Sequence, residues 1–198
     1  MPRITGVSDR DAGLSAKIAY YFTKRRFKQM TGRETETMIE PLRMYAHIPK
    51  LLSGYGKLEQ AAAKLDRLDR RYRALAELKA ATTARCEYCI DLGSQIARQW
   101  GLRDEELRAL TDYKGAACFS EVDKLVLEYA AGMSRTPVEV TDDLFGALRD
   151  HFDTAALVEV TFIIALENMR ARFNLALDIG SAGFSDGMVC ALPEADGR

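Results

Sequence analysis

Histidine is scarce in this sequence, which contains only His47 and His151 among its 198 residues. Two histidines argue against a His-rich metal site, and we expect no bound metal ion. We also expect no cofactor. Proline is also sparse, with five residues, and there is no Gly/Ser-rich linker or marked shift in composition. These absences favour a single domain over residues 1–198.

Long hydrophobic runs are missing as well. The longest apolar stretch covers 157–166, and Glu159 interrupts it. A membrane-spanning helix needs about 20 consecutive apolar residues, so we expect no membrane partner. The first residues also lack the apolar core of a secretory signal. We therefore expect a cytoplasmic protein.

An excess of charge of one sign is absent too. Lys and Arg number 28 against 29 Asp and Glu, which gives a net charge of −1. Such a chain has no general electrostatic attraction to nucleic acid, so we expect no nucleic-acid partner. Hydrophobic residues make up 47% and charged residues 29% of the chain, an ordinary balance for a globular protein. A chain of this length can bury a sufficient core without disulfides or metal.

Strand signals are nearly absent, whereas apolar residues recur with the helical period through most of the chain. We predict an all-α fold of eight to nine helices, with an N-terminal helical extension over 1–35 and an irregular tail over 180–198. Ser120 and Asp153 are suited to cap helices, and Gly101 is suited to end one. The predicted helices cover 14–30, 37–47, 50–65, 69–85, 86–100, 104–111, 121–133, 141–151 and 154–177.

The most informative motif is the pair Cys86 and Cys89 at the predicted start of a helix. Side chains at i and i+3 share one helix face, and a helix N-terminus stabilises a thiolate. Arg85 adds a positive charge beside the pair. A thiolate with a second thiol within reach can attack an oxidised substrate and be released by disulfide formation. The pair therefore favours redox chemistry.

Two other interpretations of the pair remain open. Zinc requires about four ligands, and neither a second cysteine pair nor a histidine pair completes such a site. Alternatively, the two cysteines fill a buried helix seam and have no chemistry. Cys118 and Cys190 stand alone in other segments, and we expect them to be inert.

The segment Arg71–Leu102, which contains the pair, resembles the core of the carboxymuconolactone decarboxylase/AhpD-like (alkylhydroperoxidase D-like) superfamily. The likeness extends to Tyr45–Leu52 and to the stretch from Phe119 to Gly187, which includes Ala165–Asn174 and Gly183–Gly187, and so covers most of the chain from about residue 40. The resemblance implies an all-α, AhpD-like fold and a homo-oligomer, whether dimer, trimer or hexamer. It also implies a small hydroperoxide or disulfide substrate and a thiol reductant.

In AhpD-type members the second cysteine attacks and the first resolves, which implies that Cys89 attacks and Cys86 resolves. A family glutamate before the first cysteine and a family histidine after the second form a proton relay. This sequence departs from the pattern at both places, because Ala74 and Gly93 occupy those positions.

Four other residues are candidates to replace the relay. Glu77 lies one turn after the missing glutamate and could act as a base, or it is an ordinary solvated carboxylate. Asp91 could act similarly, or it compensates the helix dipole. Tyr88 could donate a hydrogen bond to a thiolate, or it is a core aromatic. His47 could approach from a neighbouring helix, or it packs before Pro49.

These observations favour a Cys-x-x-Cys-dependent thiol–disulfide oxidoreductase with alkylhydroperoxidase-like, antioxidant activity. The alternatives are a carboxymuconolactone-decarboxylase-type lyase and a non-catalytic, redox-sensing helical oligomer. A lyase needs cations that hold a carboxylate, and the sequence offers many arginines but no identifiable cluster. The redox-sensing oligomer is an alternative because the glutamate and the histidine of the family relay are both missing.

Overall fold

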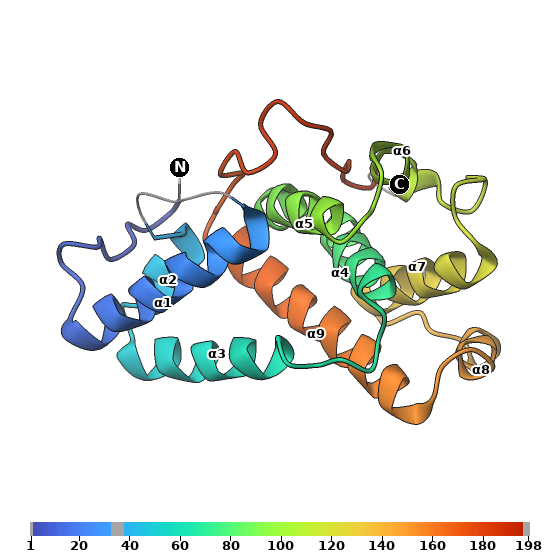
Figure 1. Cartoon of the computed structure of the whole chain (residues 1–198), viewed down its shortest axis with the longest axis horizontal. Coiled ribbons are helices and arrows are strands. Elements are labelled where there is room, and N and C mark those ends of the chain that lie inside the picture. The colour runs from blue at the N-terminus through green and yellow to red at the C-terminus, as the bar shows by residue number, and fades with distance from the viewer. Residues whose placement is uncertain (1, 33–37, 196–198) are drawn as a thin grey trace. The chain divides into compact units, whose positions relative to one another are not determined.

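The computed structural model describes residues 2–32 and 38–195, and these residues form nine α-helices, one 3₁₀ turn and no β-strand (Figure 1). The prediction of an all-α fold with eight to nine helices is confirmed. The helices are α1 Leu14–Thr31, α2 Glu40–Tyr45, α3 Pro49–Ala62, α4 Arg70–Ala84, α5 Glu87–Gln99, α6 Asp104–Ala109, α7 Glu121–Ser134, α8 Asp142–Arg149 and α9 Thr154–Ala176, and the 3₁₀ turn is Leu110–Asp112.

Local signals place most helix ends within a few residues of the prediction. Gly101 takes a φ of 98° just after α5, a left-handed conformation that glycine adopts without steric cost. Ser120 caps α7 in a reciprocal box with Asp123, and Asp153 accepts a bond of 2.7 Å from the Ala156 amide at the start of α9. Helix α2 begins at Glu40, and the predicted start at residue 37 lies outside the described residues.

Contacts between Cα atoms divide the chain into two compact units. The first contains Met1–Leu65 with Leu177–Ile179, and includes α1, α2 and α3. Within it, the Arg43 guanidinium donates to the carbonyl oxygens of Gly6 (3.1 Å) and Val7 (3.2 Å) and holds the N-terminal segment.

Helix α1 divides its apolar residues between two environments. The sequence places Leu14, Ile18, Tyr21, Phe22 and Phe27 roughly on one side, but only Phe27 of this set is buried. The buried side of α1 also contains Ala16 and Tyr20, and the other four residues of the set are exposed.

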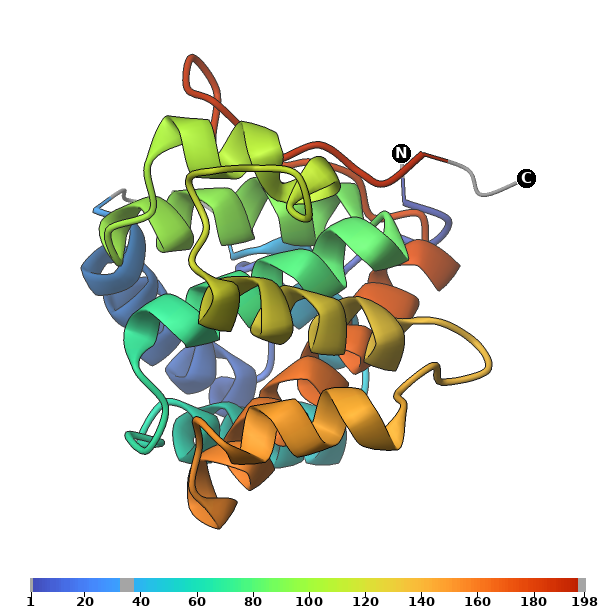
Figure 2. The same cartoon turned by 90° about the vertical axis from the view of Figure 1, so that its right-hand side faces the viewer.

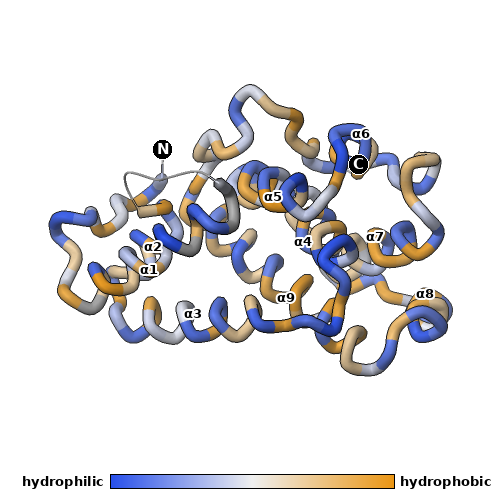
Figure 3. The backbone as a smooth tube through the Cα atoms, viewed as in Figure 1, coloured by the Kyte–Doolittle hydropathy of each residue, from blue (hydrophilic) through white to orange (hydrophobic). Residues whose placement is uncertain are grey.

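The second unit contains Asp66–Ala176 with Gly180–Arg198, and α4 lies at its centre. Helix α4 packs against α5, α7 and α9, and Figure 2 shows α4 in teal-green between its green and olive neighbours. Ala76, Ala80 and Ala81 of α4 are almost fully buried, and their small side chains permit this close packing. Orange and blue segments alternate along α9 in Figure 3, as expected for a helix with both buried and exposed positions.

The segment after α9 forms no helix through residue 195, and it is bonded to α4 and α5. The Ala191 amide donates to the Ser94 hydroxyl at 3.0 Å, and the Glu194 amide donates to the Thr82 carbonyl at 3.1 Å. None of the described helices is long and apolar enough to cross a bilayer.

Candidate functional site

Cys86 is the N-cap residue of α5, and its Sγ is joined to Cys89 Sγ in a disulfide with the two Cα atoms 5.2 Å apart. The Cys89 amide donates to Cys86 Sγ at 3.2 Å, as in a helix cap made by an oxygen side chain. A cap bond of this kind favours negative charge on the sulfur. The predicted helix start therefore holds Cys86 in the geometry that stabilises a thiolate.

Asn174, near the end of α9, lies against both sulfurs. Its Nδ2 donates to Cys89 Sγ at 3.5 Å and to Cys86 Sγ at 3.8 Å, and its side chain is buried. An amide of this kind stabilises a thiolate electrostatically, but it neither accepts nor supplies a proton at ordinary pH. The pair therefore has a hydrogen-bond donor from a second helix.

The two cysteines differ slightly in exposure. Cys86 is 0% exposed, whereas Cys89 is 7% exposed. Cys89 is thus slightly more exposed than Cys86, and Cys86 receives the cap bond. The roles implied by the resemblance, attack by Cys89 and resolution by Cys86, stay a prediction.

Asp91 is buried and holds the segment that follows α9. Its Oδ1 accepts from the Ser185 amide (2.7 Å), and its Oδ2 accepts from the Ser181 hydroxyl (2.7 Å) and from the Ala182 (2.9 Å) and Phe184 (3.0 Å) amides. Burial alone would raise the pKa of Asp91, but these donors outweigh it and hold the pKa below its usual value of 3.8. All of these bonds favour the charged carboxylate and make it a poor proton acceptor.

Glu77 lies in a group of charged side chains between α4 and α9. Its Oε1 is 3.3 Å from Arg73 Nη2 and 3.9 Å from Arg170 Nη1, and Arg170 also pairs with Glu167 at 2.9 Å. Two guanidinium groups thus contact this carboxylate, which differs from the solvated helix carboxylate of the simpler interpretation.

The two positions of the family relay are closed by packing. Ala74 is 3% exposed in α4. A Cβ added at Gly93 would lie 3.1 Å from Leu78 Cδ1, and Leu78 is itself buried. Gly93 therefore permits close contact between α5 and α4, and a histidine there would require Leu78 to shift.

The remaining candidates lie in different surroundings. Tyr88 is buried, and its ring meets the Phe184 ring edge-on at 5.7 Å. His47 lies in the first unit, is exposed, and its Nε2 is 2.9 Å from the Thr5 carbonyl oxygen. The structure therefore places Tyr88 in the second unit with the cysteine pair and His47 in the first.

The other two cysteines are free thiols. Burial raises the pKa of Cys118. Cys190 Sγ lies 3.4 Å from Ser94 Oγ on α5. Among residues 2–32 and 38–195, no group of three or more His, Cys, Asp or Glu side chains could hold a metal ion.

Sequence reasoning missed Asn174 as part of this site. Its position contains a signal, because Asn174 follows Glu167 by seven residues and the fully buried Ala171 by three, so the helical period places it on the inward face of α9. A polar residue at an inward position is more informative than an apolar one.

Comparison with known proteins agrees with this description. The sequence model described as the Carboxymuconolactone decarboxylase family matches residues 49–131. The Escherichia coli (strain K12) protein YnjA is 37% identical over 162 residues, which cover 79% of this chain and 84% of YnjA.

Two solved structures share the fold. The debrominase Bmp8 in its apo form has a TM-score of 0.78 at 18% identity, covering 92% of this chain and 93% of Bmp8. The alkylhydroperoxidase AhpD core of a peroxidase-related protein from Ralstonia eutropha JMP134 has a TM-score of 0.67 at 17% identity, covering 91% of this chain and 96% of that one.

Proposed function

Because the chain belongs to the carboxymuconolactone decarboxylase family and contains a cysteine pair at a helix start, we propose that it is a thiol–disulfide oxidoreductase that reduces small hydroperoxides. The observation that carries the proposal is the contact of Asn174 Nδ2 with both sulfurs of the Cys86–Cys89 pair. A buried amide placed on two sulfurs is better explained by thiolate stabilisation than by packing alone.

The proposed reaction begins with the Cys89 thiolate. It attacks the terminal oxygen of the hydroperoxide, the O–O bond breaks, and the alcohol leaves after taking a proton from water. Cys89 is then a sulfenic acid. The Cys86 thiolate attacks Cys89 Sγ and displaces hydroxide, which forms the disulfide. The substrate has thereby gained the two electrons that the cysteines have lost.

A dithiol reductant then completes the cycle. Its first thiolate attacks Cys89 Sγ, Cys86 leaves as a thiolate, and a mixed disulfide forms between Cys89 and the reductant. The second thiol of the reductant then attacks the reductant's own sulfur in this mixed disulfide, so that Cys89 leaves as a thiolate and the reductant is released as a cyclic disulfide. A leaving thiol departs faster when its thiolate is more stable. The cap bond from the Cys89 amide and the contact with Asn174 both stabilise Cys86 in that role.

Protons enter and leave through solvent in this proposal, since Ala74 and Gly93 occupy the relay positions. We assign Asp91 to holding the segment after α9. The pairing of Glu77 with two arginines assigns it to packing between α4 and α9. Tyr88 and His47 take part in no step of the proposed reaction.

The test uses the full chain reduced with dithiothreitol and then freed of it. Cumene hydroperoxide is added, and cumyl alcohol and the disulfide between Cys86 and Cys89 are measured together, the latter by mass spectrometry of alkylated peptides. We expect alcohol and disulfide in equal amounts, and repeated turnover when excess dithiothreitol is present. Peroxide loss no faster than in buffer with dithiothreitol would contradict the proposal. A disulfide that forms once without repeated turnover would also contradict it and would favour the redox sensor.

Replacement of Asn174 by leucine should lower the reactivity of the reduced pair. Leucine keeps the branched shape at Cγ but removes the donor, and a hydrogen bond to a charged group contributes about 1.5–3 kcal/mol. We expect alkylation of Cys89 by iodoacetamide at pH 7 to slow by about tenfold, because the thiolate fraction falls. Peptide-resolved mass spectrometry gives the rate.

Asn168→Leu is the matched control, since Asn168 is also buried in α9 but donates to Ser134 Oγ (2.9 Å) instead of to sulfur. Circular dichroism shows whether each variant is folded. Equal alkylation rates in wild type and Asn174→Leu would remove the proposed role of this amide.

A further inference from the structure

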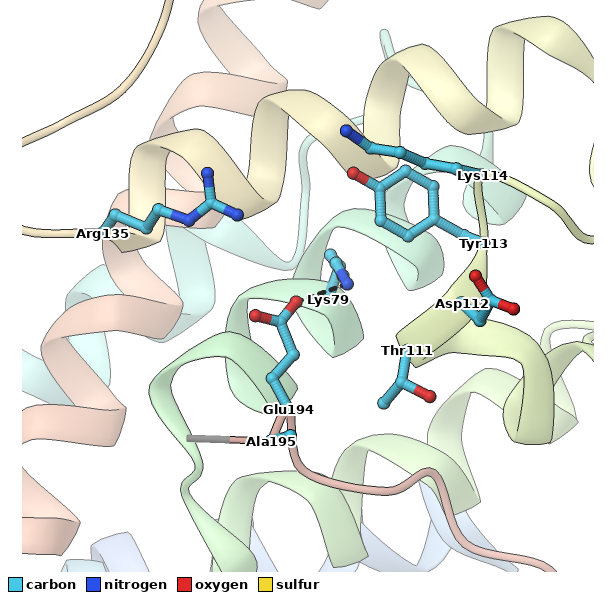
Figure 4. Close-up of a pocket in the computed structure, with 8 residues that line it drawn as sticks. All are labelled: Lys79, Thr111, Asp112, Tyr113, Lys114, Arg135, Glu194 and Ala195. Carbon is cyan, nitrogen blue, oxygen red and sulfur yellow. Dashed lines mark ion pairs between the residues drawn. The ribbon is translucent and has the colours of Figure 1, made fainter. Parts of the chain in front are cut away.

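The second unit also contains a cavity with polar walls, whose lining does not include the disulfide-bonded cysteines. This cavity of about 340 Å³ opens beside α4, between the segment after α6 and the last described residues of the chain (Figure 4). Cationic groups from three elements line it, together with a tyrosine ring, one carboxylate from the C-terminal segment and the exposed carboxylate of Asp112. The residues that carry the argument are Lys79, Tyr113, Lys114, Arg135 and Glu194.

Lys79 of α4 is 0% exposed, although its ammonium group is at the cavity. Nζ donates to the Leu110 carbonyl oxygen at 3.1 Å and lies 4.4 Å from the centroid of the Tyr113 ring. Burial lowers the pKa of Lys79, and the Glu194 carboxylate opposes this effect. A buried ammonium is costly without an anion, so this site requires a negative partner.

Glu194 supplies that partner from the end of the chain. Lys79 Nζ is 2.5 Å from Glu194 Oε1, and Thr83 Oγ1 donates to the same oxygen at 3.1 Å. Figure 4 shows the Glu194 side chain pointing at Lys79. Two donors on successive turns of α4 therefore converge on one carboxylate oxygen.

The cations at the rim have carboxylates of their own. Lys114 pairs with Glu128 at 2.7 Å, and Arg135 pairs with Glu139 at 2.6 Å. Displacement of Glu194 would therefore leave one buried positive charge without its anion, rather than three. A ligand with a single negative charge matches this balance better than phosphate does.

We propose that this cavity binds a small organic monocarboxylate, which replaces the Glu194 side chain on Lys79. The Lys79 ammonium and the Thr83 hydroxyl would take the carboxylate, and the Tyr113 ring would contact the body of the ligand. The volume of the cavity lies within the range of about 300–1,000 Å³ that small-molecule sites occupy. Glu194 is then the internal occupant that fills the site when no ligand is bound.

The ligand competes with the Glu194 side chain for Lys79, and this competition predicts how the affinity for the ligand changes when Glu194 is replaced. A side chain on a short tether acts at an effective concentration in the millimolar range or above. Glu194 must be displaced before the ligand binds, so the wild type binds weakly. Its removal should tighten binding about tenfold or more.

The test is calorimetric titration of the full chain with benzoate, which combines a carboxylate with a ring. Glu194→Gln removes the internal anion, and Lys79→Met/Glu194→Gln removes both buried charges. Glu121→Gln is the matched control, because Glu121 is an exposed carboxylate that pairs with Lys124 at 3.1 Å. Benzamide is the neutral analogue of benzoate, and inorganic phosphate is the competing anion.

We expect benzoate to bind Glu194→Gln at least about tenfold more tightly than it binds wild type or Glu121→Gln. Benzamide should not bind, and the double variant should lose benzoate binding. Equal affinity of wild type and Glu194→Gln, or binding by the double variant, would overturn the proposal. Tighter binding of phosphate than of benzoate would overturn the assignment to a carboxylate.

A second measurement covers the case in which Glu194→Gln does not fold. Benzoate at high concentration should then raise the thermal midpoint of the wild type but not that of the double variant, which contains no buried charge at this site. Equal shifts in the two proteins would overturn the proposal.

Discussion

Replacement of Cys89 by serine should reduce hydroperoxide turnover by at least about a hundredfold, because serine cannot supply the attacking thiolate. Cys86 is 0% exposed against 7% for Cys89, so we do not expect Cys86 to take its place. Cumyl alcohol production in excess dithiothreitol measures the loss. Turnover within a factor of two of the wild type would contradict the proposed function.

Replacement of Cys86 by serine should give a different result. The Cys89 thiolate remains and reduces one equivalent of peroxide, but without a resolving thiol the sulfenic acid accumulates. A dimedone adduct on the Cys89 peptide detects that acid. The matched control is Cys118→Ser, since Cys118 is a lone thiol whose pKa is raised by burial, and it should turn over like the wild type.

The sequence predicts the helix position of the two cysteines but not how far each of them is buried. Helix ends are encoded locally, so the capping box of Ser120 with Asp123 and the left-handed Gly101 could be predicted. The position of Cys86 at the start of α5 follows from the same kind of local signal. The exposed fractions of the two cysteines, 0% for Cys86 and 7% for Cys89, depend on packing between helices, which the cysteine spacing does not encode.

Contacts between distant segments account for what the sequence did not predict. Asn174 lies 85 residues from Cys89 in the chain, and Ser185 lies 94 residues from Asp91. Each is a polar pair that forms only after α5 is packed in the second unit. The cluster of cations that the sequence could not identify is another example, because Lys79, Lys114 and Arg135 converge only in the fold.

The buried face of α1 likewise depends on contacts with other segments and could not be predicted from the apolar pattern. Period alone places Ile18, Tyr21 and Phe22 near Phe27, but it does not say which side of the helix is covered. Tyr20 and Phe27 face the first unit's core, while the other three are exposed. The helical period therefore predicted the helix correctly but not its buried face.

Replacement of Asp91 by asparagine should lower the free energy of unfolding by about 3 kcal/mol, because the carboxylate accepts from four donors on the segment after α9. An asparagine presents one oxygen, and its NH₂ group would face backbone amides that need an acceptor. Asp153→Asn is the matched control, since Asp153 accepts from the Ala156 amide at a helix start, where asparagine caps equally well. Urea unfolding followed by circular dichroism at pH 7 measures both variants.

The pH dependence gives the same prediction an independent check. The folded protein holds the pKa of Asp91 below 3.8, so the charged form is favoured in the folded state and the stabilisation is complete above pH 3.8. It is lost as the pH falls below 3.8 and through the lower folded value. The stability difference between wild type and Asp91→Asn should therefore stay constant from about pH 7 to pH 5 and shrink toward pH 3. A difference that grows as the pH falls would show that the carboxylate is not the group that holds this segment.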